Sequence, residues 1–448
     1  MTELRHFTQR LADNILQYPA QALPGAIRSK ALDCVLDNVA ACLAGVSIQA
    51  ALSARQMAHA TFAKGGAPVW FTHSRLSPAG AAWCNSMAAS SLDFDDGHRL
   101  ARGHPGSAIV PAVLAEATQA HYSTPHILAA IAIGYEVAIA VAAAQQYDRT
   151  QTYQTGRWAG LGVVSACGHL VRPDRDQLAN ALAIAGVWAP NQQANGSSGY
   201  ANQTGNWAKE GIPISTMHGL MALELSRIGF TGPIDLLDHP SHYDFRHPID
   251  IGLDPGLIAD TYFKRYACCR YIHPALDAYR ALGDIEPASI ARIEVSSFGW
   301  ALRLANKLRP ETLVDAQYSL PFCLATLALH GPQALSPISQ RVLSDDRIAA
   351  FAEKIDLEID PSIDSRFPAE TLARVRVILQ SDTVLENEAA VGASALSSTD
   401  IREKFRAIAD GRISESLCQQ ILGTADPETC NINKLQLALA QPASSSER

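Results

Sequence analysis

The sequence predicts a mainly α-helical protein with an inserted α+β domain. The 448 residues exceed the size at which one hydrophobic core usually stops growing. Apolar residues recur at helical spacing from Pro24 to about Gly229 and again over the last fifty residues, whereas strand-like alternation follows only after Pro240. We therefore expect an all-helical domain built from both chain ends, residues 1–261 and 400–448, and a smaller α+β domain at 262–399.

The helical segments share an apolar face and end at Gly, Pro, Ser or Asn clusters. In PGAIRSKALDCVLDNVAACLAG, residues 24–45, the apolar positions recur every three or four residues. The longest apolar run, ILAAIAIGYEVAIAVAAA at 127–144, approaches membrane-spanning length. Because Glu136 lies at its centre and alanine dominates it, we expect a buried core helix and no membrane partner.

Two segments after Pro240 have the period of β-strands. ARIEVSSF (291–298) and LARVRVILQ (372–380) alternate apolar and polar residues, and Val375, Val377 and Leu379 share one face of the second. Helical stretches such as LPFCLATLALHG lie between them, and STDIREKFRAIADG returns to helical spacing. This order predicts a small sheet with its own helices inside the α+β domain.

Charge and cysteine content argue against some classes of function. The formal net charge is -8 and no block of Lys or Arg is present, which argues against a nucleic-acid partner. A small anionic substrate would need a local positive pocket. The nine cysteines form no C-x-x-C motif, so reduced, buried thiols are expected. The N-terminus MTELRHFTQRLADNIL has no apolar signal core, and a cytoplasmic location is expected.

The densest group of acids and bases is SLDFDDGHRLARGHPGS, residues 91–107, between two helix-like segments. One interpretation is a solvated loop with N-capping aspartates. A second is a divalent metal site of Asp93, Asp95, His98 and His104, or the acidic motif of helical diphosphate lyases, although the second acid of a DDxxD pattern is absent. A third is metal-free acid/base catalysis, in which an aspartate orients a histidine that moves a proton.

Two later segments favour the third interpretation. KRYACCRYIHPALDA, residues 264–278, places two arginines, Lys264 and His273 close together, as either a basic hinge or a carboxylate clamp. Lys209, in GNWAKEGIPISTMHGL, precedes a helical run. It is either a surface lysine or a partly buried lysine that serves as a base or polarises a carboxylate.

The chain resembles the MmgE/PrpD family over nearly its whole length. The resemblance rests on several motifs in the same order: LDFDDGH...GHPGSAIVPAVLA, GYEVAIAVA, YQTGRWAGLGVVSACGHLV with ALAIAGV, AKEGIPISTMHGLMALELSRIGFTGP, FKRYACCRYIHPALDA, AQYSLPFCLA and IREKF. The resemblance implies an all-helical domain from both chain ends, an α/β lid, a homodimer, and no cofactor or metal. It also implies a small di- or tricarboxylate substrate.

Members of this family include 2-methylcitrate dehydratase, cis-aconitate decarboxylase and iminodisuccinate epimerase, which move a proton or electron density next to a carboxylate. By motif, the resemblance places five residues in the active site: Asp93, His104, Lys209, His273 and Tyr318.

Two departures from the family's motifs favour epimerisation. Dehydratases and decarboxylases of the family typically have a threonine where this chain has Gly97, and here one extra residue precedes His104. They also have a histidine where this chain has Tyr153, ahead of the Thr155–Gly156 pair. Epimerisation needs no leaving group, only two opposed acid/base groups, and Tyr153 with Lys209 is the predicted pair.

The remaining roles complete the hypothesis of an iminodisuccinate-type epimerase. We expect Asp93 to orient His104, and His98 to reach the substrate or to cap the loop. Carboxylates would be held by three residues: Arg102, Arg270 and His273. The alternatives are a hydro-lyase of the 2-methylcitrate dehydratase type or a decarboxylase, and a protein that binds polycarboxylates without catalysis.

Overall fold

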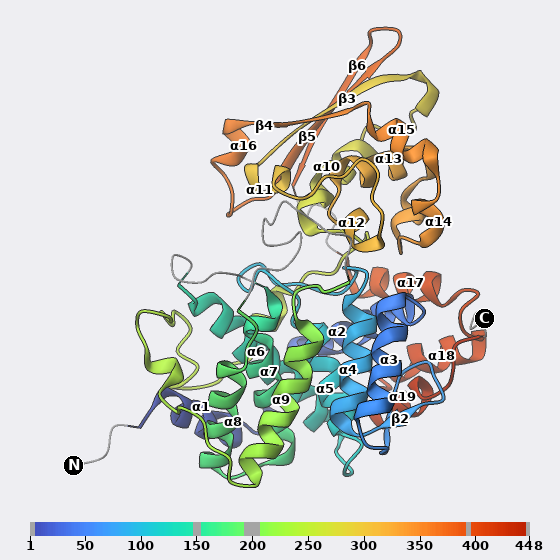
Figure 1. Cartoon of the computed structure of the whole chain (residues 1–448). Helices are drawn as coiled ribbons and strands as arrows, with labels where there is room; N and C mark the ends of the chain where they lie inside the picture. Colours follow the sequence, from blue (N-terminus) through green and yellow to red (C-terminus); the bar gives the residue numbers. More distant parts are fainter. Residues whose placement is uncertain (1–4, 147–153, 192–206, 391–395, 445–448) are drawn as a thin grey trace.

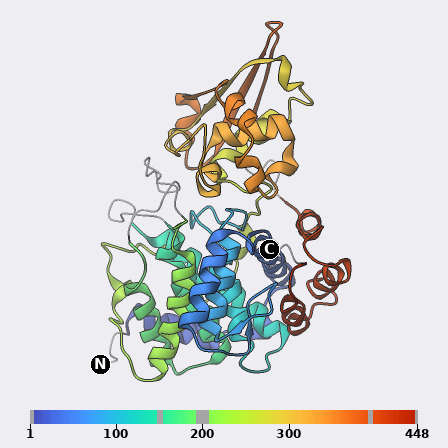
Figure 2. The ribbon, with the colours of Figure 1, turned by 45° about the vertical axis from the view of Figure 1, so that its right-hand side comes forward.

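The computed structural model describes residues 5–146, 154–191, 207–390 and 396–444. Tyr153 lies outside these residues. Within them the chain is mostly helical, with one four-stranded sheet and one two-stranded ribbon, which confirms the predicted fold class at that level. Figure 1 shows the sheet and its helices grouped above the remaining helices, and Figure 2 shows the same separation after rotation.

The lower group contains helices from both ends of the sequence (Figure 1). Its N-terminal helices are α1 (Phe7–Gln17), α2 (Gly25–Gly45), α3 (Gln49–Thr61), α4 (Pro78–Ser90), α5 (Gly106–Glu116), α6 (Thr124–Ala144), α7 (Ala159–Val171), α8 (Arg175–Val187) and α9 (Ile212–Arg227). The C-terminal helices are α17 (Ser398–Ala409), α18 (Glu415–Thr424) and α19 (Ile432–Leu439), and α17 packs against α2. A two-stranded ribbon, β1 (Ala67–Pro68) and β2 (Arg75–Leu76), packs beside α4.

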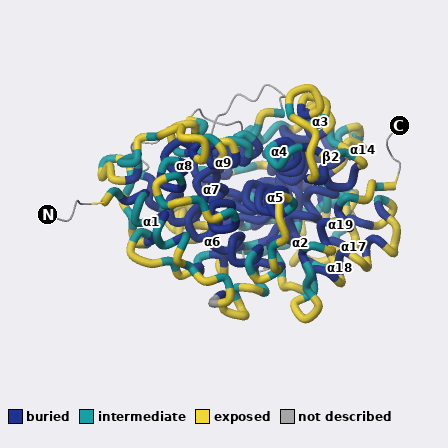
Figure 3. Tube along the Cα trace, turned by 90° about the horizontal axis from the view of Figure 1, so that it is seen from below, coloured by how far each residue is buried: buried dark blue, intermediate teal, exposed yellow. Residues whose placement is uncertain are grey.

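Helices α5, α6 and α7 form the core of this group. Nearly all of their residues are buried, and exposed residues lie at the periphery (Figure 3). Helices α6 and α7 can approach closely because Gly162 has no side chain. A Cβ atom built on it would lie only 2.7 Å from the Ala138 Cβ. Among the described helices, α6 is long and apolar enough to cross a membrane, as are α2 and α3 if taken as one bent span. In α6, 94% of that apolar window is buried inside the protein, so α6 is the core helix that the sequence predicts.

The upper group is built on a four-stranded sheet of order β4-β3-β5-β6. Its strands are β3 (Ile290–Ser297), β4 (Ile355–Ile359), β5 (Leu372–Leu379) and β6 (Val384–Ala390). Strands β3 and β4 are parallel and the other pairs antiparallel, with Val295 opposite Val375. The predicted strands at 291–298 and 372–380 are thus confirmed as β3 and β5 within a residue at each end, and their buried valines form one face.

Helices cover this sheet. α10 (His273–Arg280) packs on β5 and β6, and α13 (Leu320–His330) on β4 and α15 (Asp346–Ala352). Four single-turn helices complete the group: α11 (Gly299–Leu302), α12 (Leu313–Gln317), α14 (Gln340–Leu343) and α16 (Pro361–Asp364).

The loop between α4 and α5, residues 91–105, joins the two groups and is called the acid loop below. Gly97 pairs with Tyr262 through two backbone hydrogen bonds of 2.9 Å, and the Arg99 guanidinium donates to the Ala369 carbonyl. The acid loop is therefore held from the N-terminal helices on one side and from the chain around the sheet on the other.

Candidate active site

The aspartates of the acid loop are buried rather than solvated. The α4 helix ends at Ser90, and the backbone then turns through a left-handed conformation at Asp93, with φ 53°. Aspartate adopts this conformation at lower cost than most residues. The turn places Asp93, Asp95 and Asp96 in the interior, at 2%, 1% and 1% exposure. The interpretation of the motif as a solvated loop is therefore wrong, but its capping part is confirmed, because Asp96 Oδ1 accepts from the Gly106 N–H at the start of α5, at 3.0 Å.

Two ammonium groups neutralise Asp93. The Nζ of Lys264 lies 2.8 Å from Oδ2, and the Nζ of Lys209 lies 3.2 Å from Oδ1. Burial alone would raise the pKa of the Asp93 carboxyl, but the charges of Lys209, Lys264 and His104 hold it well below its usual range. Asp93 is therefore a fixed negative charge at neutral pH and not a proton acceptor.

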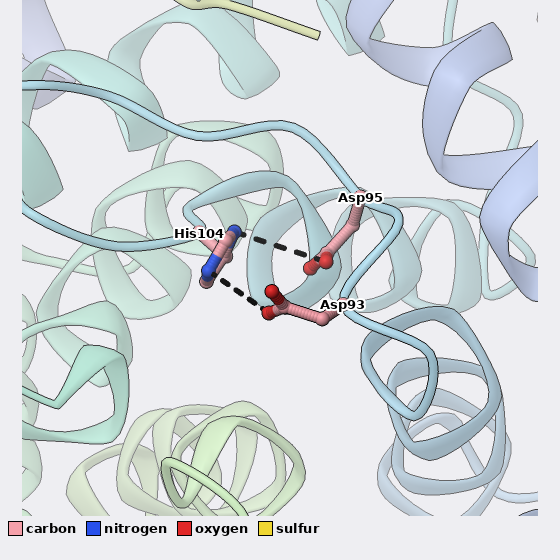
Figure 4. Close-up of side chains that lie close together, drawn as sticks. All are labelled: Asp93, Asp95 and His104. Atoms are coloured by element: carbon pink, nitrogen blue, oxygen red, sulfur yellow. Dashed lines mark ion pairs between the residues drawn. The ribbon is translucent and has the colours of Figure 1, made fainter. Parts of the chain in front are cut away.

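His104 is fixed by a main-chain acceptor. Its Nδ1 lies 2.6 Å from the Asp96 carbonyl oxygen, which can only accept, so Nδ1 carries a proton. The sequence predicts that Asp93 orients this ring, and the structure instead gives that role to the Asp96 carbonyl. Asp93 Oδ1 lies 3.5 Å from Nε2 (Figure 4), and Glu210 Oε1 lies 4.0 Å from the same atom. Nε2 is the nitrogen left to exchange a proton.

Asp93, Asp95 and His104 also group as metal ligands do, with one donor atom each within 4.8 Å of one another. However, both oxygens of Asp93 already accept from lysines, and the His104 Nδ1 is committed to a carbonyl. A cation at this point would have to displace an ammonium group. His98, the fourth residue of the metal interpretation, donates its Nε2 hydrogen to the Leu257 carbonyl at 3.0 Å. These residues fit a lysine-neutralised acid/base site better than a metal centre.

A third buried lysine holds the acid loop from the C-terminal helices. The Lys404 Nζ donates to Asp37 Oδ1 and to the Phe94 carbonyl, both at 2.7 Å. Burial lowers the pKa of Lys404, although the Asp37 charge opposes this effect. Lys404 belongs to the IREKF motif, and no sequence pattern connects it with Asp37 or with the acid loop.

Glu210 is a further site residue that the sequence analysis missed. The Thr155 hydroxyl accepts from the His104 backbone N–H at 3.1 Å and donates to Glu210 Oε2 at 2.7 Å. This chain of contacts places the buried Glu210 carboxylate near the imidazole. Its position directly after Lys209, in AKEG, is the signal that identifies it.

A cavity of about 1160 Å³ opens beside Asp93 and His104 and is lined from both groups of elements. Its cationic lining residues are Arg99, Arg102, Arg246, Lys264 and Arg270, and its acidic ones include Glu210, Asp244 and Asp260. With Asp93 included, five cationic side chains and four carboxylates line the cavity, a small positive excess in a protein whose formal net charge is -8.

Four of the predicted substrate-binding residues line this cavity: His98, Arg102, Arg270 and Tyr318. The Arg270 guanidinium carbon lies 4.3 Å from the centre of the Tyr262 ring. Burial lowers the pKa of His98 to about 4, so this imidazole is neutral near pH 7.

Lys209 and His273 are not among the residues that line the cavity. The Lys209 Nζ has three acceptors within 3.2 Å, on Ser90, Asp93 and Gln317, which suits a protonated ammonium rather than a neutral base. His273 donates its Nε2 hydrogen to the Cys268 carbonyl at 3.3 Å, and burial lowers its pKa to about 3. The predicted partner of Lys209, Tyr153, lies outside the described residues.

The chain combines a mostly helical body and a small sheet with a buried cluster of acids and bases beside a cavity. The chain belongs to the MmgE/PrpD family: the model of the MmgE/PrpD N-terminal domain matches residues 9–244, and that of the C-terminal domain matches 266–426.

Two curated relatives are enzymes named cis-aconitate decarboxylase. The chain is 24% identical to the one from Homo sapiens over 467 residues, covering 96% of this chain and 94% of the relative. It is 26% identical to the one from Mus musculus over 397 residues, covering 80% and 78%. These similarities favour a lyase over the predicted epimerase.

Proposed function

We propose that this protein is a lyase that decarboxylates a small polycarboxylate, with cis-aconitate as the first substrate to test. The observation that carries the proposal is the position of His104, whose Nε2 faces two carboxylates at the edge of the cationic cavity. The decarboxylase relatives support the same reaction class.

Arg102 and Arg270 are suited to hold the carboxylates of such a substrate. Both line the cavity, and a guanidinium binds a carboxylate through two parallel hydrogen bonds. Lys264 adds a positive charge that Asp93 keeps protonated: burial alone would lower the pKa of Lys264, but the Asp93 carboxylate raises it above its usual value.

In the reaction, the bond between a carboxyl carbon and its neighbour breaks, CO2 leaves, and the electron pair stays on the substrate carbon. Cationic groups already in place stabilise this developing negative charge without reorganising. His104 then delivers a proton from Nε2 to that carbon, which completes the replacement of the carboxyl group by hydrogen. Asp93 acts through its charge and remains ionised throughout.

The test is an assay of the purified full-length protein with cis-aconitate, 2-methylcitrate and iminodisuccinate, with and without a chelator. We expect release of CO2 from cis-aconitate, unchanged by the chelator. The proposal fails if none of the three compounds loses CO2, or if turnover requires added metal.

Epimerisation is the second candidate, and the specific observation in its favour is that Tyr153 and Gly97 replace the histidine and threonine of the decarboxylase motifs. An epimerase exchanges the substrate Cα proton with D2O and releases no CO2. The same panel, followed by NMR in D2O, separates the two reactions.

A further inference from the structure

Tyr262 is fixed against the acid loop by main-chain pairing. The N–H of Gly97 donates to the Tyr262 carbonyl, and the N–H of Tyr262 donates to the Gly97 carbonyl, both at 2.9 Å. This isolated antiparallel bridge holds residue 262 at a set distance from the loop that carries Asp93 and His104. The position of the Tyr262 side chain is therefore tied to the site itself.

Gly97 leaves the space that the Tyr262 ring fills. A Cβ atom built on Gly97 would lie 2.3 Å from the Tyr262 hydroxyl oxygen and 2.4 Å from Cζ, far inside van der Waals contact. The phenol end of the ring thus lies directly over the Gly97 backbone. Any larger residue at position 97 would push this hydroxyl away from its place.

Charged groups of the site surround the same phenol. The Arg270 guanidinium lies over the ring at 4.3 Å from its centre, and Tyr262 lines the cavity together with Asp93, His104 and Lys264. The described part of the chain gives the Tyr262 hydroxyl no hydrogen-bond partner. Burial, opposed by the charges of Arg270 and Lys264, raises the pKa of this phenol, so it is a hydrogen-bond donor at neutral pH.

We propose that Tyr262 is a catalytic residue that donates a hydrogen bond from its hydroxyl to the bound polycarboxylate, and that Gly97 serves to admit it. This inference rests on the proposed function, because it assigns one contact within that reaction. The phenol keeps its proton, and the hydrogen bond strengthens as negative charge develops on the substrate. It adds a neutral donor beside the cationic Arg270 and Lys264.

Tyr262→Phe tests this role because it removes one oxygen and keeps the ring that packs on Gly97. We expect kcat/KM for the substrate to fall about 10- to 100-fold, mostly through kcat, as for the loss of a hydrogen bond to a charged group. The matched control is Tyr279→Phe, a buried tyrosine that does not line the cavity, with activity within about twofold of the native protein. Native kinetics in Tyr262→Phe would overturn the inference.

Gly97→Ala, introduced into the native protein and into Tyr262→Phe, tests whether Gly97 makes room for the Tyr262 hydroxyl. We expect it to lower kcat/KM in the native protein by displacing the hydroxyl, and to add much less to the loss in Tyr262→Phe. Fully additive losses would show that Gly97 does not serve the Tyr262 hydroxyl. Urea unfolding midpoints of all variants establish that each one is folded.

Calorimetry with tricarballylate, a saturated tricarboxylate, separates failure of this inference from failure of the proposed function. If the native protein turns over no substrate, the proposed function fails, and binding then decides the role of Tyr262. At least tenfold weaker binding by Tyr262→Phe supports the contact, and equal binding refutes it. If the native protein neither turns over a substrate nor binds tricarballylate, both proposals are refuted.

Discussion

The Lys264 Nζ lies 2.8 Å from Asp93 Oδ2 and 3.0 Å from the Asp93 carbonyl oxygen, with the two side chains 1% and 3% exposed. One ammonium group thus binds both the side chain and the backbone of the same strained residue. Lys264 lies just before the sheet-containing part of the chain, and Asp93 lies in the acid loop. This ion pair therefore supports the fold and positions the site residue Asp93 at the same time.

Lys264→Met should therefore destabilise the protein strongly. The substitution leaves the Asp93 carboxylate buried without the ammonium group that lies 2.8 Å from Oδ2, and breaking a buried pair typically costs about 3 to 5 kcal/mol. The free energy of unfolding in urea measures the effect. The control Lys64→Met, at an exposed position, should change it by less than about 0.5 kcal/mol. A similarly small change for Lys264→Met would show that the buried pair does not support the fold.

Glu136 should make stability depend on pH in the opposite direction to an ordinary ion pair. Burial raises the pKa of its carboxyl to about 7, so the folded state holds a proton that the unfolded state loses near pH 4 to 5. The unfolded state therefore binds fewer protons between these values, and stability falls as the pH rises through that window. The stability that the protonated Glu136 carboxyl contributes is fully present only below the pKa of the unfolded state, near pH 4 to 5.

Glu136→Gln should remove this dependence, because an amide oxygen can still accept from the Leu257 N–H, which is 2.9 Å from Oε2 in the native protein. Relative to native, the variant should gain about 2 kcal/mol of stability between pH 5 and pH 8.5. Urea unfolding at the two pH values checks this, with the exposed Glu224→Gln as control. A difference that is the same at both pH values would refute the expected linkage.

Arg270→Gln should weaken substrate binding. Loss of a charged hydrogen-bond pair costs about 1.5 to 3 kcal/mol, which corresponds to a rise in KM of roughly 10- to 100-fold. Arg303 is the matched control because it also stacks on an aromatic ring, at 4.9 Å from the centre of Trp300, but is exposed and does not line the cavity. If Arg303→Gln and Arg270→Gln raise KM equally, Arg270 has no special role in holding the substrate.

The parts of the fold predicted from sequence are those with a strong local pattern. β5 alternates cleanly, and its buried valines, Val375 and Val377, confirm the face that the pattern predicts. β4 (IDLEI) does alternate between apolar and polar residues, but it is only five residues long and was not identified. Only Ile355 among its residues is buried, so the alternation does not mark a buried face. Its position is set by parallel pairing with β3, which no local pattern encodes.

Prediction of the site from the sequence is limited in the same way, to residues that lie close together along the chain. The acids and the histidine of the acid loop were identified because they cluster within a few residues. By contrast, Lys264 lies 171 residues from Asp93 and Lys404 lies 310 residues from Phe94, so only the folded chain shows that these ammonium groups neutralise and hold the loop. The role expected of Lys209 changed for a similar reason, because its three acceptors come from distant segments.

The most direct test of the central claim compares the native protein with His104→Gln by NMR in D2O, with cis-aconitate as substrate. We expect the native protein to release CO2 and to place one solvent deuterium on the carbon that loses the carboxyl group. His104→Gln should be at least about 100-fold slower while still binding tricarballylate, and the buried control His169→Gln should retain activity. Native turnover by His104→Gln, or deuterium exchange without CO2 release in the native protein, would contradict the account.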